Sequence, residues 1–127
     1  MRYRVGAVDE FAVGAWKLVH VDGRELGVYN RGDRLFAVRN RCPHEGAPLC
    51  LEALRGTMVP SAPGTYTSGL EGRVLTCPWH GWEFDIETGK MVFGTGEARL
   101  RRYPVEIEDR AVFVVLDERE RVKEVRA

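Results

Sequence analysis

Two short segments constrain the fold of this chain more than any other part of its sequence: RCPHEGAPLC at 41–50 and TCPWHGWEFD at 76–85. Each contains a cysteine followed by a proline, and then a histidine and a glycine. Together they hold all three cysteines and two of the three histidines of the chain. Thiolate and imidazole groups in such a repeated layout are typical of metal ligands. The fold is therefore expected to bring the two segments together.

The rest of the sequence predicts strands rather than helices. Apolar and β-branched runs are short, and turn residues such as Asp-Gly at 22–23 separate them, which is a signal of antiparallel hairpins. A helical periodicity is hard to find. The predicted fold class is therefore all-β with antiparallel sheets. The predicted strands are 16–21, 24–30, 34–40, 73–76, 103–109 and 111–117.

A chain of 127 residues has the size of one domain. We expect a single domain over 1–117, in which the loops at about 41–50 and 76–85 carry the Cys/His pairs. The segment at about 56–69 is rich in Gly, Pro, Ser and Thr, and it is expected to be an irregular inserted loop. Residues 118–127 are mostly charged and are expected to form a C-terminal tail.

The composition excludes several classes of protein. Lys and Arg together number 19, as do Asp and Glu, so the chain lacks the basic excess of a nucleic-acid-binding protein. No apolar run approaches the ~18 residues of a membrane span, and no secretory signal is visible. A cytoplasmic location is therefore expected. Because thiols stay reduced there, an odd number of cysteines favours metal binding over disulfides.

Four residues are the candidate ligands: Cys42, His44, Cys77 and His80. Three interpretations are open at this point. The four could be core residues without a metal, although their placement in two matching loops argues against this. They could bind structural zinc, but each loop supplies one cysteine and one histidine, which is not the order of a zinc finger. They could bind a [2Fe–2S] cluster in which two histidines replace two cysteines on one iron.

RCPHEGAPL and CPWHGWEFD resemble the two cluster-binding segments of Rieske proteins, above all of Rieske ferredoxins and of the Rieske domains of ring-hydroxylating oxygenases. The resemblance implies the Rieske fold, with antiparallel β-sandwich-like sheets and a small cluster-binding subdomain formed by the two loops. It also implies one Rieske-type [2Fe–2S] cluster per chain. Backbone N–H groups around Gly46 and Gly81 would donate hydrogen bonds to its sulfides. Two cysteines would bind its inner iron and two histidines its outer iron, namely Cys42 and Cys77, and His44 and His80.

Two differences from other Rieske proteins affect the predicted state of Cys50 and the predicted reduction potential. Respiratory members have a further cysteine in each segment, and the two form a disulfide; here Ala47 and Trp79 stand at those positions. Cys50 is then expected to be a free, buried thiol. High-potential members place Ser and Tyr hydroxyls near the cluster sulfurs, where this chain has Trp82 and Phe84. Because such hydrogen bonds stabilise the reduced cluster, their absence predicts a reduction potential of about −150 mV, at the low end of the Rieske range.

The resemblance implies a one-electron carrier that passes electrons from a reductase to a terminal oxygenase or a similar oxidoreductase. We expect no catalytic mononuclear-iron domain in a chain of this length. We therefore expect an electron-transfer component rather than a stand-alone enzyme, with no flavin or NAD of its own. Two alternatives are a tightly bound Rieske subunit of a nitrite-reductase-like or other oxidoreductase complex, and a structural zinc-binding interaction module.

Overall fold

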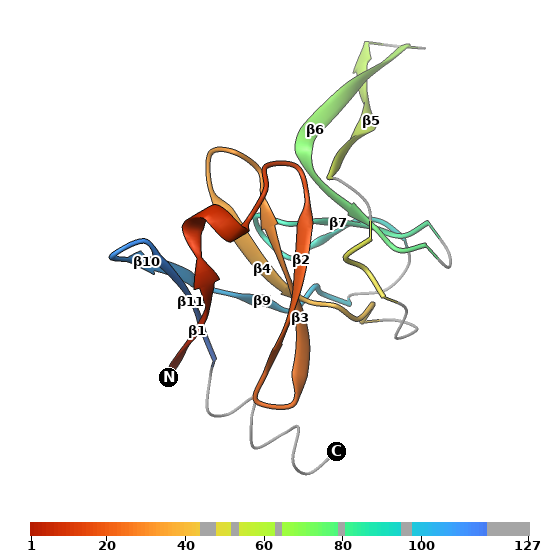
Figure 1. Cartoon of the computed structure of the whole chain (residues 1–127). Helices are drawn as coiled ribbons and strands as arrows, with labels where there is room; N and C mark the ends of the chain where they lie inside the picture. Colours follow the sequence, from red (N-terminus) through yellow and green to blue (C-terminus); the bar gives the residue numbers. More distant parts are fainter. Residues whose placement is uncertain (44–47, 52–53, 63–64, 79–80, 95–97, 117–127) are drawn as a thin grey trace.

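The computed structural model describes residues 1–43, 48–51, 54–62, 65–78, 81–94 and 98–116, with the backbone alone over 55–62 and 65–71. Antiparallel strands in three sheets account for almost all of the regular structure (Figure 1). The prediction of an all-β, antiparallel fold is confirmed. The charged tail predicted over 118–127 lies outside the described residues.

The predicted meander is present as a four-stranded sheet. Its strands are β2 (Trp16–Val21), β3 (Arg24–Asn30), β4 (Leu35–Arg39) and β9 (Arg102–Tyr103), paired in that order. The turn between the first two strands is tight because Asp22 and Gly23 both have positive φ angles, 50° and 80°. This is the backbone that a two-residue hairpin with a type I′ turn requires.

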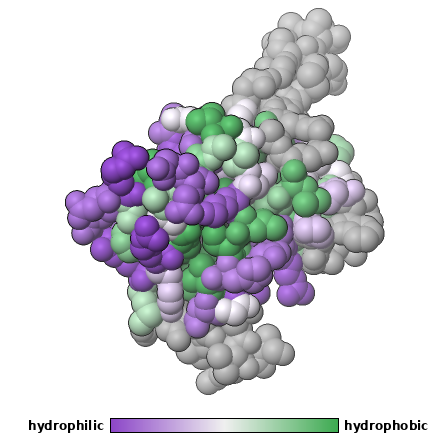
Figure 2. Space-filling view, in the orientation of Figure 1, coloured by the Kyte–Doolittle hydropathy of each residue, from purple (hydrophilic) through white to green (hydrophobic). Residues whose placement is uncertain are grey.

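A second sheet packs beside the meander. It has three strands, β1 (Arg2–Ala7), β11 (Ala111–Val115) and β10 (Val105–Glu108), and the short 3-10 helix η1 (Val8–Glu10) follows β1. The run predicted as one strand over 103–109 is divided at Pro104, so that β9 joins one sheet and β10 joins the other. In the view of Figure 2, hydrophilic residues gather over the β10 end of the molecule.

The third sheet is the smaller subdomain that carries the second Cys/His segment. Its strands are β5 (Arg55–Ala62), β6 (Thr65–Thr76), β7 (Glu83–Asp85) and β8 (Met91–Phe93). Strands β5 and β6 form a long hairpin that projects from the rest of the molecule (Figure 1). The prediction of an irregular loop over about 56–69 is therefore wrong for the described part of that segment. Pro60 is tolerated because β5 is the edge strand of its sheet.

Two hydrophobic clusters form the core. One lies between the meander and the three-stranded sheet and includes Leu26, Val28 and Val112. The other joins the meander to the third sheet, and it includes both Cys42 and Cys77. In the described part of the chain, no helix is long and apolar enough to cross a membrane.

Candidate metal centre

The two cysteines predicted as ligands lie in one buried region. Cys42 follows β4 after two intervening residues, and Cys77 follows β6 directly. Their exposed fractions are 2% and 1%. Both belong to the same hydrophobic cluster, although the strands that lead to them are in different sheets. The fold therefore buries in a shared core the two soft sulfur donors that a metal centre would need.

The two predicted histidine ligands, His44 and His80, lie outside the described residues, and so do Gly46, Ala47 and Trp79. Among the residues that the structure describes, no three His, Cys, Asp or Glu side chains come together as a metal site. The described part of the chain thus holds one half of the predicted ligand set, the cysteines.

The second segment is a hairpin connection whose ends are tied together. Strands β6 and β7 pair up to Thr76 and Glu83. The Cys77 N–H donates to the carbonyl oxygen of Trp82 at 2.7 Å, and the Gly81 N–H donates to the carbonyl oxygen of Cys77 at 2.9 Å. Gly81 has a φ of 70°, a backbone conformation that favours glycine. An added Cβ would meet no atom within 4 Å, so lack of space is not the reason for glycine there. The Gly81 N–H thus takes part in closing this connection.

Cys50, the third cysteine, is not arranged as a ligand. Its side chain is 4% exposed and is not in a disulfide, which confirms the prediction of a free, buried thiol. Burial, together with the negative charge of Glu25, raises the pKa of the Cys50 thiol well above its usual range. The Cys50 sulfur packs against Gly27, where an added Cβ would lie only 2.2 Å from Cys50 Sγ.

Trp82 and Phe84 are part of the apolar packing around the cysteines. They stand where high-potential Rieske proteins have hydroxyl-bearing residues. Phe84 is fully buried in the same cluster as Cys42 and Cys77. Trp82 is half-buried and packs against that cluster. Gly94 allows the indole to lie close to the backbone after β8, because a Cβ there would be 2.9 Å from Trp82 Cδ2. These side chains present carbon surface, not O–H donors, to the region of the two cysteines.

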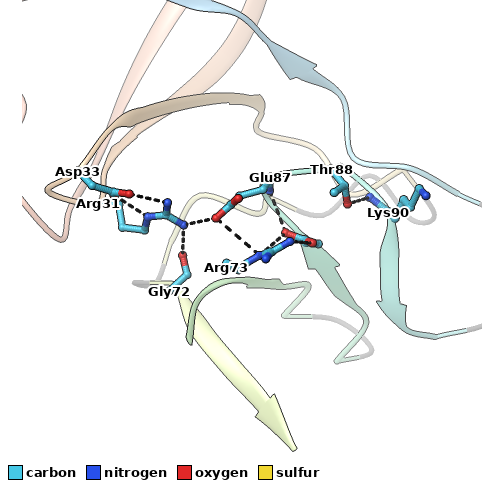
Figure 3. Close-up of polar contacts among 8 residues, drawn as sticks. Arg31, Asp33, Gly72, Arg73, Glu87, Thr88 and Lys90 are labelled. Carbon is cyan, nitrogen blue, oxygen red and sulfur yellow. Dashed lines mark hydrogen bonds and ion pairs between the residues drawn. The ribbon is translucent and has the colours of Figure 1, made fainter. Parts of the chain in front are cut away.

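An ion-pair network joins the meander to the third sheet (Figure 3). Arg31, in the turn between β3 and β4, donates two hydrogen bonds to Asp33, both at 2.7 Å. It also donates to Glu87 Oε2 at 2.7 Å and to the carbonyl oxygen of Gly72 at 3.3 Å. Its guanidinium group lies 4.8 Å from the centre of the Phe36 ring. One side chain of the meander thus contacts both β6 and the turn that follows β7.

The network continues through Arg73, which makes a two-fold hydrogen bond to Asp85 and lies 3.6 Å from Glu87. Hydrogen bonds from Arg31 lower the pKa of Asp33 to about 2 and also lower the pKa of Glu87. Burial by itself would raise the pKa of Asp85, but the bonds from Arg73 and from the Glu87 N–H outweigh it, and the pKa is lowered. The network was not predicted from the sequence, because ion pairs between residues far apart in the chain leave no local pattern.

Comparison with known proteins decides the family. The model of the Rieske [2Fe-2S] domain matches residues 1–104 of this chain. The chain belongs to the Rieske [2Fe–2S] domain family. Its cofactor is accordingly a Rieske-type [2Fe–2S] cluster.

The Rieske relatives include ferredoxins of known systems. The chain is 31% identical over 98 residues to the naphthalene 1,2-dioxygenase system ferredoxin component of Pseudomonas putida, covering 77% of this chain and 79% of that protein. It is 29% identical over 112 residues to ferredoxin CarAc of Metapseudomonas resinovorans, covering 87% and 90%. The predictions of the family, of its cluster and of an electron carrier of the ferredoxin type are confirmed.

Solved structures show the same Rieske fold. The ferredoxin of carbazole 1,9a-dioxygenase from Nocardioides aromaticivorans IC177 has a TM-score of 0.70 at 25% identity, over 92% of this chain and 99% of that one. A ferredoxin from Sphingomonas yanoikuyae B1 has a TM-score of 0.67 at 27% identity, over 92% and 100%. A putative nitrite reductase small subunit, at 14% identity and a TM-score of 0.64, shares the fold alone.

The described residues fit this cofactor. Two buried cysteines at the ends of two strands, in one apolar cluster, match the sulfur ligands of a Rieske cluster. The third cysteine, Cys50, belongs to the same cluster and packs on Gly27 of β3. Cys42 and Cys77 would hold the cluster, and the chemistry that it supplies is the reversible uptake of one electron.

Proposed function

We propose that this chain is a one-electron carrier that delivers electrons to the oxygenase component of a dioxygenase-type system. The observation that supports it most is the burial of Cys42 and Cys77 in one apolar cluster, in a chain whose relatives are ferredoxin components. In this proposal Cys42 and Cys77 bind the inner iron, and His44 and His80 bind the outer iron. Residues 1–117 form the single domain around that site.

The chain's own residues have two tasks in this function. Burial of Cys42 and Cys77 keeps water away from the sulfur ligands. Trp82 and Phe84 surround this region without hydroxyl donors, which supports a potential at the low end of the Rieske range. A carrier with a low potential can pass its electron to acceptors that a high-potential cluster cannot reduce.

A docking face for the oxygenase is supported by exposed apolar side chains beside the two segments. Phe93 in β8 is 63% exposed, and it pairs across the sheet with Glu83, which belongs to the second segment. Leu51 follows the first segment and is 61% exposed. Large apolar side chains at such positions are typical of protein contact sites. A carbazole 1,9a-dioxygenase ferredoxin, 26% identical with a TM-score of 0.69, is known in complex with its oxygenase.

We further propose that the donor is a separate reductase that supplies the flavin or nicotinamide chemistry, and that the carrier works in the cytoplasm. The alternative of a permanently bound subunit of a nitrite-reductase-like enzyme gains no specific support, because that resemblance shows the fold alone. A structural zinc module is not supported by relatives that are ferredoxins.

The test is a stopped-flow experiment without oxygen. The reduced chain is mixed with oxidised oxygenase components of the naphthalene and carbazole systems, and its re-oxidation is followed by absorbance. We expect re-oxidation with a rate that rises with oxygenase concentration. Phe93→Ser should lower the second-order rate about tenfold, which is the usual cost of losing a central apolar contact.

The matched control is Ile107→Ser. Ile107 lies in β10 of the three-stranded sheet, and its 56% exposure is close to that of Phe93. This variant should keep the rate of the unchanged protein. A cluster that is reduced reversibly but gives its electron to none of these oxygenases would contradict the proposed role.

A further inference from the structure

One side chain, that of Asn40, closes the base of the first cluster-binding segment. Asn40 lies between the end of β4 and Cys42. Its Oδ1 atom accepts hydrogen bonds from the backbone N–H groups of Leu49 and Cys50, each at 2.8 Å. Both donors belong to buried residues. The residue that leads into the segment therefore holds the residues that lead out of it.

The other half of the Asn40 amide is held by the meander. Nδ2 donates to Glu25 Oε1 at 2.8 Å, and the Asn40 backbone N–H donates to the carbonyl oxygen of Glu25 at 3.0 Å. The second carboxylate oxygen of Glu25 lies 3.3 Å from His20 Nε2. The orientation of the amide follows from this chemistry, because a flipped amide would place its NH₂ group against the two backbone donors. Asn40 thus connects β3 to the end of the segment.

A second contact fixes the same end. Cys50 packs on Gly27 in β3 so closely that a Cβ there would lie 2.2 Å from Cys50 Sγ and 2.6 Å from Cys50 Cβ. The end of the segment is therefore attached to β3 twice, once through Asn40 and Glu25 and once by this packing.

Asparagine suits the position because its planar group offers an acceptor and a donor together. Alanine would leave two buried N–H groups without their acceptor. Aspartate would keep the acceptor but would set a carboxylate against that of Glu25.

We propose that Asn40 is a positioning residue for the [2Fe–2S] site. It fixes the start and the end of the segment that carries Cys42, and it thereby sets Cys42 relative to Cys77. Residues that orient metal ligands in this way tune both the affinity for the metal and its potential. The inference rests on the proposed ligands, whereas the closure of the segment by Asn40 does not.

The experiment compares full-length, cluster-containing variants by hydrogen-exchange mass spectrometry and by EPR. Asn40→Ala removes the closure. Asn30→Ala is the matched control, because Asn30 makes the same two kinds of bond elsewhere, from Nδ2 to the Phe11 carbonyl at 2.7 Å and to Oδ1 from the Gly32 N–H at 2.8 Å. Asn40→Asp with Glu25→Gln reverses donor and acceptor between the two side chains and keeps the acceptor for the backbone.

For Asn40→Ala we expect exchange in the peptide covering Leu49 and Cys50 to accelerate about tenfold or more, together with a broadened EPR signal and a shifted midpoint potential. Asn30→Ala should leave all three unchanged. The Asn40→Asp, Glu25→Gln double variant should restore the slow exchange and the signal.

Unchanged exchange in Asn40→Ala would overturn the proposal, and so would faster exchange with an unchanged signal and potential. If Asn40→Ala does not fold, the double variant decides: fast exchange at Leu49 and Cys50 in that variant, when folded, refutes the role of Asn40. A chain that binds no cluster would refute the proposed function, but its exchange rates would still test the closure.

Discussion

Replacing Gly27 by alanine should destabilise the protein through one identifiable collision. Gly27 is buried in β3, and its φ does not require glycine. An added Cβ would lie 2.2 Å from Cys50 Sγ, 2.6 Å from Cys50 Cβ and 2.8 Å from Trp16 Cε3. Carbon atoms in good contact are about 3.5–4.0 Å apart. The Cys50 sulfur can rotate away, but its Cβ cannot, because the Cys50 backbone is hydrogen-bonded to Asn40.

The expected cost follows from these distances. Overpacking by one methyl group costs about 1–3 kcal/mol, and a collision with a fixed Cβ belongs to the upper part of that range. Alanine recovers roughly 0.5–1 kcal/mol relative to glycine within a strand. The net loss should be about 2 kcal/mol, which at a urea dependence of roughly 2 kcal/mol per molar lowers the unfolding midpoint by about 1 M.

Urea unfolding followed by tryptophan fluorescence measures this loss, with all variants prepared and scanned in the same way. The decisive comparison is Gly27→Ala in a Cys50→Gly background, where both Cys50 side-chain atoms of the collision are gone. There the substitution should cost about 1 kcal/mol less than in the unchanged protein, since residues in contact are coupled by roughly 0.5–3 kcal/mol. Equal costs in the two backgrounds, or a Gly27→Ala midpoint within error of the unchanged protein, would show that the added Cβ does not collide with Cys50.

Three further predictions concern acid, thiol reactivity and potential. The pKa of Asp33 is lowered to about 2, and the pKa of Glu87 is also lowered. The two carboxylates therefore contribute fully to stability above their unfolded pKa values of about 4, and this contribution disappears as the pH falls toward 2. Urea midpoints at pH 7 and pH 3 should differ less in Glu87→Gln than in the unchanged protein, and an equal difference would show that the contact with Arg31 contributes nothing. Cys50 should resist iodoacetamide at pH 8 in the native protein and react in urea, because its thiol is buried and its pKa is raised; fast native labelling would contradict its burial. The midpoint potential should lie near −150 mV, and Phe84→Tyr should raise it if the hydroxyl reaches a cluster sulfur; a midpoint above zero in the unchanged protein would contradict the role given to the missing hydroxyls.

Local signals in the sequence predicted the meander well. Strands at 16–21 and 24–30 were predicted with the bounds that β2 and β3 have, because Asp22 and Gly23 mark the turn between them. The burial of Cys42 and Cys77 in one cluster agrees with the expectation that the two segments meet.

The other features of the fold and of the site depend on contacts that the periodicity of the sequence does not reveal. The hairpin of β5 and β6 has the composition of a loop, and its two strands pair through backbone N–H and C=O groups, which leave no side-chain signal in the sequence. Pro104 divides a strand-like run between two sheets, which the apolar pattern alone does not reveal. Asn40 reads as an ordinary residue before a cysteine, and its importance appears only when the N–H groups of Leu49 and Cys50 are seen to lie against it.

The EPR spectrum of the dithionite-reduced protein, purified without air, shows whether two cysteines and two histidines hold one [2Fe–2S] cluster. The ligand set of Cys42, His44, Cys77 and His80 predicts a rhombic signal whose average g lies clearly below that of all-cysteine clusters, with nitrogen couplings from two imidazoles. An all-cysteine type of signal, or a colourless and silent protein that contains zinc, would contradict it.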